Sequence, residues 1–339
     1  AILDALEPSD RVAVEQALAY PEESAGRLMQ REVVHAPEHW TVGAMIDYLR
    51  TRKQELPEQF YHIILTDPRL KPTGYVTLGR LLSSPRATRL IDVTEDSFRT
   101  IPATQHEDDV AYAFNQYHLI SAPVVDEDGR LVGVITIDDA MIVLDEGAQE
   151  DLLKLAGVGE ESSLSDRVIE TTKQRFPWLF VNLITAILAS LVIAQFEAAI
   201  AQIVALAVLM PIVASMGGNA GTQSLTVAVR AIATRDLTRS NLMRVVLREG
   251  AVGLINGLVF AAVMGFVGLI WFGSLALGGV IAAAMVINLL VAGLAGILIP
   301  VLLDRLNIDP ALASGAFVTT VTDVVGFLAF LGLAVVFLL

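Results

Sequence analysis

The sequence predicts a chain of two unlike halves: an α/β half built from a tandem repeat, followed by an all-α membrane domain of five helices. Charge is concentrated before residue 151, where 26 of the 37 acidic and 13 of the 23 basic residues lie. Beyond that point five apolar segments follow one another, each long enough to cross a bilayer as a helix of ~20 residues. A chain of 339 residues is also long enough for two or more domains.

The first half repeats one pattern of strands and helices. β-rich runs at 61–65 and 74–78 return at 121–125 and 133–137, with Gly74 and Gly133 59 residues apart. Amphipathic patterns before each pair predict helices at 41–50 and 107–117. The DEDG segment between the last two runs is a hairpin signal. We therefore expect two α/β copies, 24–87 and 88–144, after a short helical segment at 1–23.

These two copies resemble a tandem pair of CBS domains, an α/β module that commonly senses adenosine nucleotides or cations. In nucleotide-binding copies, an Asp three residues after a Ser or Thr at the end of the last strand accepts the ribose hydroxyls. The second copy has Thr136 and Asp139 in these places, whereas the first has Thr77 and Arg80. The resemblance thus implies at most one ATP-type site per pair. Asp138 and Asp139 suit a helix start equally well, since acids there cap free N–H groups.

The charge of the first half indicates which partners to expect. Its net charge is −13, against −1 for residues 151–339. Such a surface repels nucleic acid and concentrates cations, so we expect metal or polyamine and no nucleic acid; a solubilising surface explains the charge equally well. The chain has no cysteine, which excludes disulfides and thiolate metal sites. The five histidines are scattered over the first half, a pattern typical of surface or core positions rather than a transition-metal site.

Residues 145–175 predict a charged helix, or pair of helices, that joins the two halves. The segment is polar around most of its circumference, as in a helix that bridges two domains or in a solvated linker. If it bridges domains, its acids can share a cation with acids on a neighbouring surface. The candidate regulatory metal ligands are Asp108, Asp109, Asp138, Asp139, Asp145, Glu150 and Asp151.

The second half, 176–339, is predicted to be the membrane domain. Its five spans lie at 176–196, 198–229, 250–272, 277–303 and 311–339. Basic residues precede the first span and occur between the second and third and between the fourth and fifth, while the other two loops have none. By the positive-inside rule, the N-terminus and the acidic half lie in the cytoplasm and the C-terminus outside the cell (inner) membrane. No signal peptide is visible at the start.

Two features inside the spans bear on helix geometry and packing. Pro300 is expected to bend or end the fourth span. Asn256 and Asn288 are expected to form hydrogen bonds between helices, and Gly253 and Gly257 to allow close helix approach.

The segment PIVASMGGNAGTQ at 211–223 is the most unusual part of the second span. It places a proline, adjacent glycines and polar side chains inside an apolar helix. Helix breakers and amides at membrane depth persist where the chain is buried in protein or lines a water-filled path. We therefore predict that this segment lines a pore, with Gly217, Gly218, Asn219, Gly221, Thr222 and Gln223 as its residues.

Asp323 lies near the middle of the last span. An ionisable group at that depth is costly and marks a functional site. An internal ion pair is the alternative, but the spans contain no mid-membrane Lys or Arg to form one. An intramembrane aspartyl protease is a poor hypothesis, since it needs two facing carboxylates and only Asp323 lies at depth, with Glu197 at a membrane boundary.

Together these features resemble the MgtE family of magnesium channels and transporters. The resemblance is carried by GGNAGTQ at 217–223, by Asp323 in TDVVG and by NIDPALASG at 307–315, and it extends from residue 24 to the end. It implies that 1–23 is the remnant of a helical N-terminal domain. It also implies a homodimer in lipid with one pore between its membrane halves, CBS pairs that bind Mg²⁺, and plug helices at 145–175 that then hold the gate shut.

The chemistry of Mg²⁺ agrees with such a pore. The ion demands six oxygens at ~2.0 to 2.1 Å and sheds water reluctantly, so a pore does best by grasping the hydrated ion with few charges. One carboxylate per subunit, doubled by a twofold axis, offers two charges to one dication. The residues expected to contact the ion are Asp323, the Thr319 carbonyl, Gly315 and Asn219.

The sequence departs from the family pattern at several places. Ile142 stands where a third acid often follows Asp138 and Asp139, and His106 and His118 occupy places that tend to be acidic. Because fewer carboxylates bind a hard cation less tightly, Mg²⁺ sensing is expected to be weaker, displaced or lost. The loop before the last span has no proline after Gly315, so entry into that helix is expected to be less rigid.

Two transport mechanisms fit the sequence. We expect a magnesium-selective channel, not an enzyme, that moves Mg²⁺ into the cytoplasm down its electrochemical gradient. A Na⁺-coupled or broader divalent cation (Mg²⁺, Mn²⁺, Co²⁺) transporter fits as well, because both classes use broken helices and a midplane carboxylate.

Overall fold

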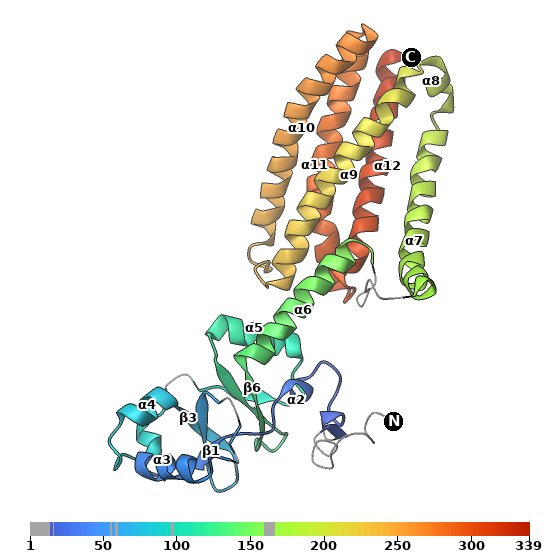
Figure 1. Cartoon of the computed structure of the whole chain (residues 1–339). Coiled ribbons are helices and arrows are strands. Elements are labelled where there is room, and N and C mark those ends of the chain that lie inside the picture. Colours follow the sequence, from blue (N-terminus) through green and yellow to red (C-terminus); the bar gives the residue numbers. More distant parts are fainter. Residues whose placement is uncertain (1–13, 16, 55, 58–59, 96–97, 159–166) are drawn as a thin grey trace. The chain divides into compact units, whose positions relative to one another are not determined.

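The computed structural model (Figure 1) describes residues 14–15, 17–54, 56–57, 60–95, 98–158 and 167–339. The chain forms two compact units, Ala1–Ala148 and Gln149–Leu339. Most of the predicted N-terminal remnant, 1–23, and residues 159–166 of the predicted linker lie outside the described residues.

The first unit contains two three-stranded sheets of the same topology. In each, the first strand runs parallel to the second, and the second pairs antiparallel with the third. The registers are equivalent, because His62 pairs with Thr77 and Ser121 pairs with Thr136. The predicted repeat is confirmed. The strands are β1 (His35–Pro37), β2 (His62–Thr66), β3 (Pro72–Thr77), β4 (Ile101–Pro102), β5 (Ser121–Val125) and β6 (Leu131–Thr136).

Helices accompany each sheet near their predicted positions. Thr41 caps the first long helix by accepting a hydrogen bond from the Ala44 N–H at 3.2 Å. His118 ends α5 in the left-handed conformation, a common helix C-terminus. The helices are α2 (Ala25–Leu28), α3 (Val42–Thr51), α4 (Leu78–Ser83), the 3₁₀ helix η2 (Leu90–Val93), α5 (Glu107–Tyr117) and α6 (Ile137–Leu155).

The two copies exchange short segments. Ala25 and Met29 pack in the core of the second copy, and the Gln30 backbone bridges to Val134 at the edge of that copy's sheet. Conversely, Leu90 and Val93 pack in the core of the first copy. Each copy therefore completes its core with residues from beyond its own strands.

The second unit contains five helices long and apolar enough to span a membrane. The five predicted spans are thus present as helices, several of them starting earlier than predicted. Those of 29 to 31 residues are about 45 Å long at 1.5 Å per residue, so their ends reach beyond a ~30 Å hydrocarbon core. The helices are α7 (Val168–Ala194), α9 (Ala205–Ala233), α10 (Leu242–Phe272), α11 (Leu275–Arg305) and α12 (Pro310–Leu338), with short α8 (Glu197–Gln202) after α7.

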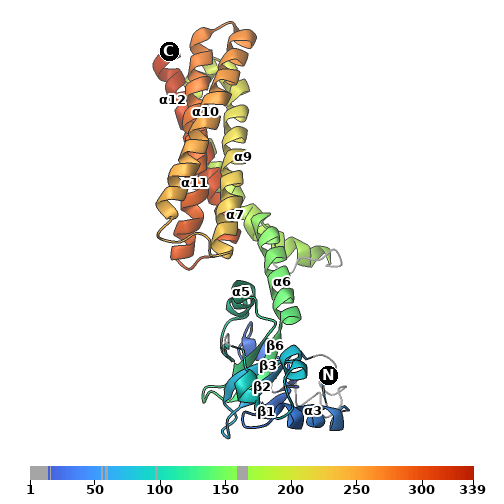
Figure 2. The same ribbon diagram turned by 90° about the vertical axis from the view of Figure 1, so that its left-hand side faces the viewer.

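Helix α11 is the centre of the second unit. It packs against α9, α10 and α12, while α7 lies beside α12 (Figures 1 and 2). Glycines permit the close approach: a methyl group at Gly253 would lie 2.6 Å from the Leu289 carbonyl oxygen, and one at Gly257 would lie 3.0 Å from the Val286 Cα. The predicted packing role of these two glycines is confirmed.

The helix breakers do not break their helices. Helix α9 continues through 211–223 with Pro211 inside it, and α11 continues past Pro300 to Arg305. Of the two expectations for Pro300, an end of the helix there is therefore wrong, and a bend stays a prediction. A proline removes one backbone hydrogen bond, and packed neighbouring helices allow a membrane helix to continue through it.

Candidate ion pathway and regulatory site

Helix α9 carries a polar stripe, which we define as Ser215, Asn219, Thr222 and Thr226. Spacings of four, three and four residues place these exposed side chains on one helix face. Their hydrogen bonds stay on the helix: Asn219 Nδ2 donates to Ser215 Oγ at 3.5 Å, and the two threonine hydroxyls donate to backbone carbonyls at 2.9 Å. The stripe thus satisfies its polar groups locally and leaves spare acceptor capacity on an exposed surface.

The glycines of 217–223 divide between the two faces of α9. Gly217 is buried, and a methyl group there would overlap the side-chain amide of Asn288 in α11. Gly221 is also buried, and a methyl group there would lie 2.6 Å from Val318 Cγ1. Gly218 has open space around it. Of the residues predicted to line a pore, Asn219, Thr222 and Gln223 are exposed, whereas Gly217 and Gly221 pack against the chain's own helices.

Asp323 on α12 is half-buried, and no described residue gives its carboxylate a hydrogen bond or an ion pair. Its neighbour Thr322 is buried against Gly221, and Gly326, less than one turn later, lies against the Asn288 amide that also meets Gly217. These contacts place Asp323 at the level of Asn219 on the adjacent helix. A free carboxylate and an exposed amide therefore share one depth in the bundle.

The carbonyls expected to assist Asp323 already accept hydrogen bonds. The Thr322 hydroxyl donates to the Thr319 carbonyl at 3.0 Å, and the Thr319 hydroxyl donates to the Gly315 carbonyl at 3.0 Å. A carbonyl oxygen has two lone pairs, and the helix itself uses one. Either carbonyl would contact an ion or its water shell only after the hydroxyl turned away.

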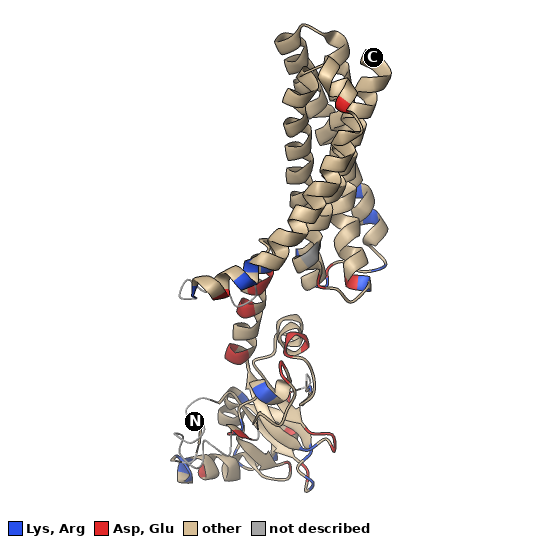
Figure 3. Ribbon diagram, turned by 90° about the vertical axis from the view of Figure 1, so that its right-hand side faces the viewer, with Lys and Arg blue, Asp and Glu red and all other residues tan. Residues whose placement is uncertain are grey.

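The sequence did not single out a second carboxylate of the helical unit, that of Glu249. Glu249 in α10 is buried, 8% exposed, and its Oε2 accepts a hydrogen bond from Ser224 Oγ at 2.9 Å. The predicted third span began at residue 250, which left Glu249 outside it, whereas α10 begins at Leu242 and includes Glu249. Figure 3 shows that the helices of this unit are otherwise nearly uncharged along their length. Unlike Glu249, Asp323 has no hydrogen-bond donor among the described residues.

In the first unit, Asp139 caps its own helix. Its Oδ2 accepts from the Thr136 backbone N–H at 3.3 Å, from the Thr136 hydroxyl at 2.8 Å and from Gln30 Nε2 at 2.9 Å. The capping alternative is thus present, and the Gln30 amide binds the same carboxylate oxygen, Oδ2. The cavity beside it, between the copies at His62 and Ser121, has a volume of about 20 Å³. Nucleotide-sized ligands need hundreds of cubic ångströms.

Several acidic residues lie close together at the start of α5, and some of them were not among the metal ligands predicted from the sequence. Burial raises the pKa of Glu107, and the neighbouring carboxylates of Glu23, Asp108 and Glu146 raise it further, while His106 opposes them. His106 lies 3.1 Å from Glu23 and 3.6 Å from Asp108. Glu23, Glu107 and Glu146 were missed because their contacts join segments far apart in sequence. Throughout the described residues, no three metal-binding side chains come close enough to hold a metal ion.

The end of α6 belongs to the second unit and meets the start of α12. The largely buried ammonium of Lys154 lies 3.2 Å from Asp309 and 3.4 Å from Glu150. Leu155 packs against the cluster of Leu225, Val229, Ala311 and Val318. Asp309 also caps α12, since its Oδ1 accepts from the Ala311 N–H at 2.8 Å. Glu150, predicted to bind a cation, is thus paired with Lys154.

The duplicated α/β unit and the five apolar helices define a multi-pass membrane protein that carries CBS-type domains. A family model for CBS domains matches residues 91–146, and the MgtE model, described as a divalent cation transporter, matches residues 210–333. The magnesium transporter MgtE of Bacillus subtilis is 31% identical over 99% of this chain and 74% of its own length. That of Thermus thermophilus is 34% identical over 98% and 74%.

The chain therefore belongs to the MgtE family of magnesium transporters. Among solved structures, the cytosolic domain of the Mg²⁺ channel MgtE in complex with ATP is 32% identical, with a TM-score of 0.39. The match covers 42% of this chain and 56% of that one, a little over half its length.

Proposed function

We propose that this protein conducts Mg²⁺ as a homodimer, with the hydrated ion passing between two copies of the α9 polar stripe and two copies of Asp323. The observation that carries the proposal is the unpaired Asp323 carboxylate at the level of Asn219. Two such carboxylates match the charge of one dication. Hydroxyl and amide groups of the stripe would hold its water shell, and so few charges let the ion leave again.

The orientation of the protein in the membrane follows from the charge of the loops. Arg235, Arg239 and Arg305 lie at one end of the helices, in the α9–α10 connection and at the end of α11. The positive-inside rule assigns that end, and with it the N-terminal half, to the cytoplasm. Five spans then place the C-terminus outside, in a multi-pass protein of the cell membrane. Mg²⁺ would enter down its electrochemical gradient, which negative membrane potential favours.

Regulation would act through α6. Repulsion among the acids around Glu107 favours binding of a cation there, with Asp108, Asp109, Asp138 and Asp145 as further oxygen ligands and a second copy completing the coordination. The other end of α6 holds Lys154 against Asp309 at the start of the helix that carries Asp323. Mg²⁺ bound in the first unit would hold this contact and close the pathway. ATP at Thr136 and Asp139 would have to displace the Gln30 amide.

Mg²⁺ flux into proteoliposomes tests the proposal. Removal of the charge in Asp323→Asn should abolish selective Mg²⁺ uptake, while Glu197→Gln, which neutralises an exposed acid at the start of α8, should leave it unchanged. Retained selectivity in Asp323→Asn would contradict the pore. A Na⁺ gradient is then imposed across the membrane, and movement of Mg²⁺ against its own gradient would identify a Na⁺-coupled transporter. Competition by Mn²⁺ or Co²⁺ would identify a transporter of broader divalent cation specificity.

A further inference from the structure

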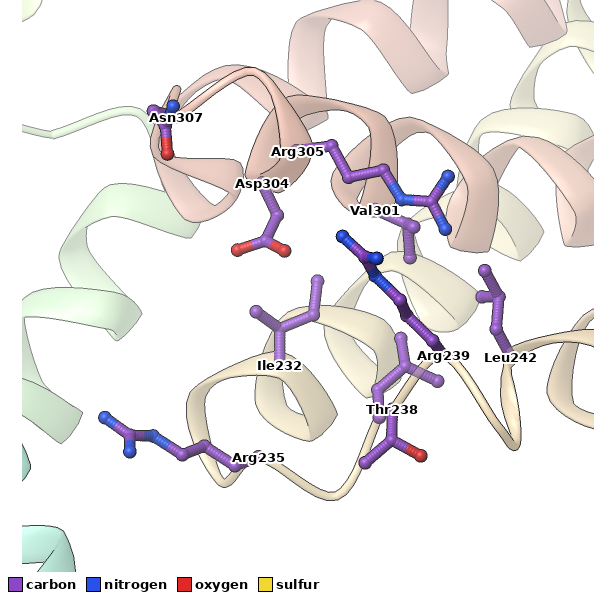
Figure 4. Close-up of a pocket in the computed structure, with 10 residues that line it drawn as sticks. Ile232, Arg235, Thr238, Arg239, Leu242, Val301, Asp304, Arg305 and Asn307 are labelled. Carbon is purple, nitrogen blue, oxygen red and sulfur yellow. The ribbon is translucent and has the colours of Figure 1, made fainter.

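A cavity of about 840 Å³ lies between the α9–α10 connection and the end of α11, away from the α9 polar stripe and Asp323 (Figure 4). Three arginines, Arg235, Arg239 and Arg305, and one acid, Asp304, line it. Their formal charges leave a net +2 in one pocket. The proposed ion pathway uses none of these residues, and a cationic pocket would repel Mg²⁺.

Two of the three arginines, Arg239 and Arg305, are not neutralised by the part of the chain that the structure describes. Among the residues that the structure describes, Arg239 and Arg305 form no ion pair or hydrogen bond, and Asp304 forms none with either of them. Figure 4 shows the guanidinium groups of Arg239 and Arg305 directed into the same space. Like charges at close range repel unless an anion lies between them. Planar guanidinium groups suit phosphate because two N–H groups can bind two of its oxygens at once.

The pocket is preformed by its connecting segments. Asn241 fixes the α9–α10 connection, because its Nδ2 donates to the Asp236 carbonyl at 2.7 Å and its Oδ1 accepts from the Thr238 N–H at 2.8 Å. Arg235 and Asn307 both adopt left-handed backbone, at φ 57° and 55°. For arginine this conformation costs on the order of 1 kcal/mol relative to glycine. Arginine therefore stands at position 235, where glycine would fit the backbone better.

The position and lining of the pocket suit a lipid. Helices of about 45 Å place their ends at the depth of phospholipid headgroups. The apolar side chains of Ile232, Leu242 and Val301 line the same cavity as the arginines. A ligand with a phosphate at one end and acyl chains at the other matches both surfaces. Basic pockets between membrane helices bind anionic headgroups in this way.

We propose that this pocket binds the headgroup of an anionic phospholipid, with Arg239 and Arg305 on the phosphate. The site would be filled whenever the protein lies in a membrane that contains such lipids. Soluble phosphate shares the headgroup's chemistry but cannot contact the apolar lining at the same time.

Native mass spectrometry of the purified full-length chain tests the proposal. It measures the retention of phosphatidylglycerol and of phosphatidylcholine with identical acyl chains. We expect the wild type to prefer phosphatidylglycerol. Arg239→Gln with Arg305→Gln should weaken that binding roughly 30-fold, since each basic side chain near the surface contributes about fivefold. The control, Arg244→Gln with Arg248→Gln, removes the same charge from exposed positions on α10 outside the pocket and should change it little.

Equal losses of phosphatidylglycerol binding in the two double variants would overturn the proposal, because the lipid would then be attracted by the overall positive charge. No loss in either double variant would overturn it too, because the lipid would then bind elsewhere. Displacement of phosphatidylglycerol by equimolar inorganic phosphate would identify a soluble anion as the occupant instead and overturn it too. If the pocket double variant fails to fold, the single variants Arg239→Gln and Arg305→Gln should each show about a fivefold loss. Unchanged binding in both single variants would also reject the site.

Discussion

The side-chain amide of Asn288 in α11 donates a hydrogen bond of 2.8 Å to the Val213 carbonyl in α9. Asn288 is fully buried, and its amide lies between Gly217 of α9 and Gly326 of α12. One side chain thus joins three helices at the level where the glycine-rich segment meets the Asp323 helix. The predicted interhelical hydrogen bond of Asn288 is confirmed.

Replacement of Asn288 should loosen this three-helix junction. In Asn288→Leu the side-chain size is similar but the hydrogen bond is lost, so we expect the free energy of unfolding to fall by about 1 to 2 kcal/mol and Mg²⁺ flux to fall with it. The matched control is Asn256→Leu in α10, where the amide is exposed and has no described partner. Thermal unfolding in detergent and proteoliposome flux measure the two effects. Equal destabilisation by both variants would contradict the role given to Asn288.

The glycines of α9 should separate packing from pore function. Gly217→Ala adds a methyl group against Asn288, and Gly221→Ala adds one 2.6 Å from Val318, so each should destabilise the membrane unit by about 1 to 3 kcal/mol. Gly218→Ala meets open space and should keep or slightly raise stability through helix propensity. Unfolding temperatures compare the three variants. If Gly218→Ala is the least stable, the packing of α9 described above is wrong.

Sequence periodicity predicted the elements well but not their partners. The repeat was visible because the β-rich run around Gly74 returns around Gly133, 59 residues later, and the spans because apolar runs need no tertiary information. In the structure His62 and Ser121 occupy equivalent register positions. The sequence pattern also marked Asn219 and Thr222, whose side chains are exposed on one face of α9. It could not show that Gly217 and Gly221 face inward, because that depends on which helix lies opposite.

Contacts between distant segments account for the rest. Gln30 reaches Asp139 from 109 positions away, so no local pattern could show that this carboxylate accepts a hydrogen bond from the Gln30 amide. Glu249 was excluded by a span boundary drawn at residue 250, where charge ends in the sequence, although α10 includes it and Ser224 donates a hydrogen bond to its buried carboxylate. Both cases concern polar groups whose cost of burial is offset by one long-range hydrogen bond.

The contact between the two copies in the first unit should depend on pH. His62 Nδ1 and Ser121 Oγ form a hydrogen bond, and the His62 ring packs edge-on against Tyr75 with centroids 4.4 Å apart. Burial lowers the pKa of His62, although the Glu95 carboxylate opposes the shift. The unfolded state therefore binds the proton more readily. The stability that neutral His62 contributes is present above the ordinary pKa of about 6.5 and is lost as the pH falls below it.

Hydrogen exchange of the β2 and β5 amides at pH 7 and pH 5, corrected for intrinsic rates, measures this effect. Wild-type protection should drop at pH 5, whereas His62→Gln, which keeps a polar side chain without a titration, should flatten the dependence. The control His35→Gln changes an exposed histidine on β1 and should retain the wild-type drop. A drop of the same size in His62→Gln would exclude this histidine as its source.

The link between α6 and α12 should set how tightly the pathway closes, given the proposed gating. Lys154 is largely buried and lies 3.2 Å from Asp309, which also caps the helix that carries Asp323. Lys154→Met removes the ion pair and should raise Mg²⁺ flux at high cytoplasmic-side Mg²⁺ about fivefold, the equivalent of roughly 1 kcal/mol for a partly exposed pair. Asp309→Asn keeps a capping side chain and should give a similar rise, and the double variant should add little more.

Glu150→Gln, the control, removes only the pair between Lys154 and Glu150 on α6 and should leave the flux within twofold. Additive effects of Lys154→Met and Asp309→Asn, or a rise in Glu150→Gln as large as theirs, would show that the contact between α6 and α12 does not hold the pathway shut.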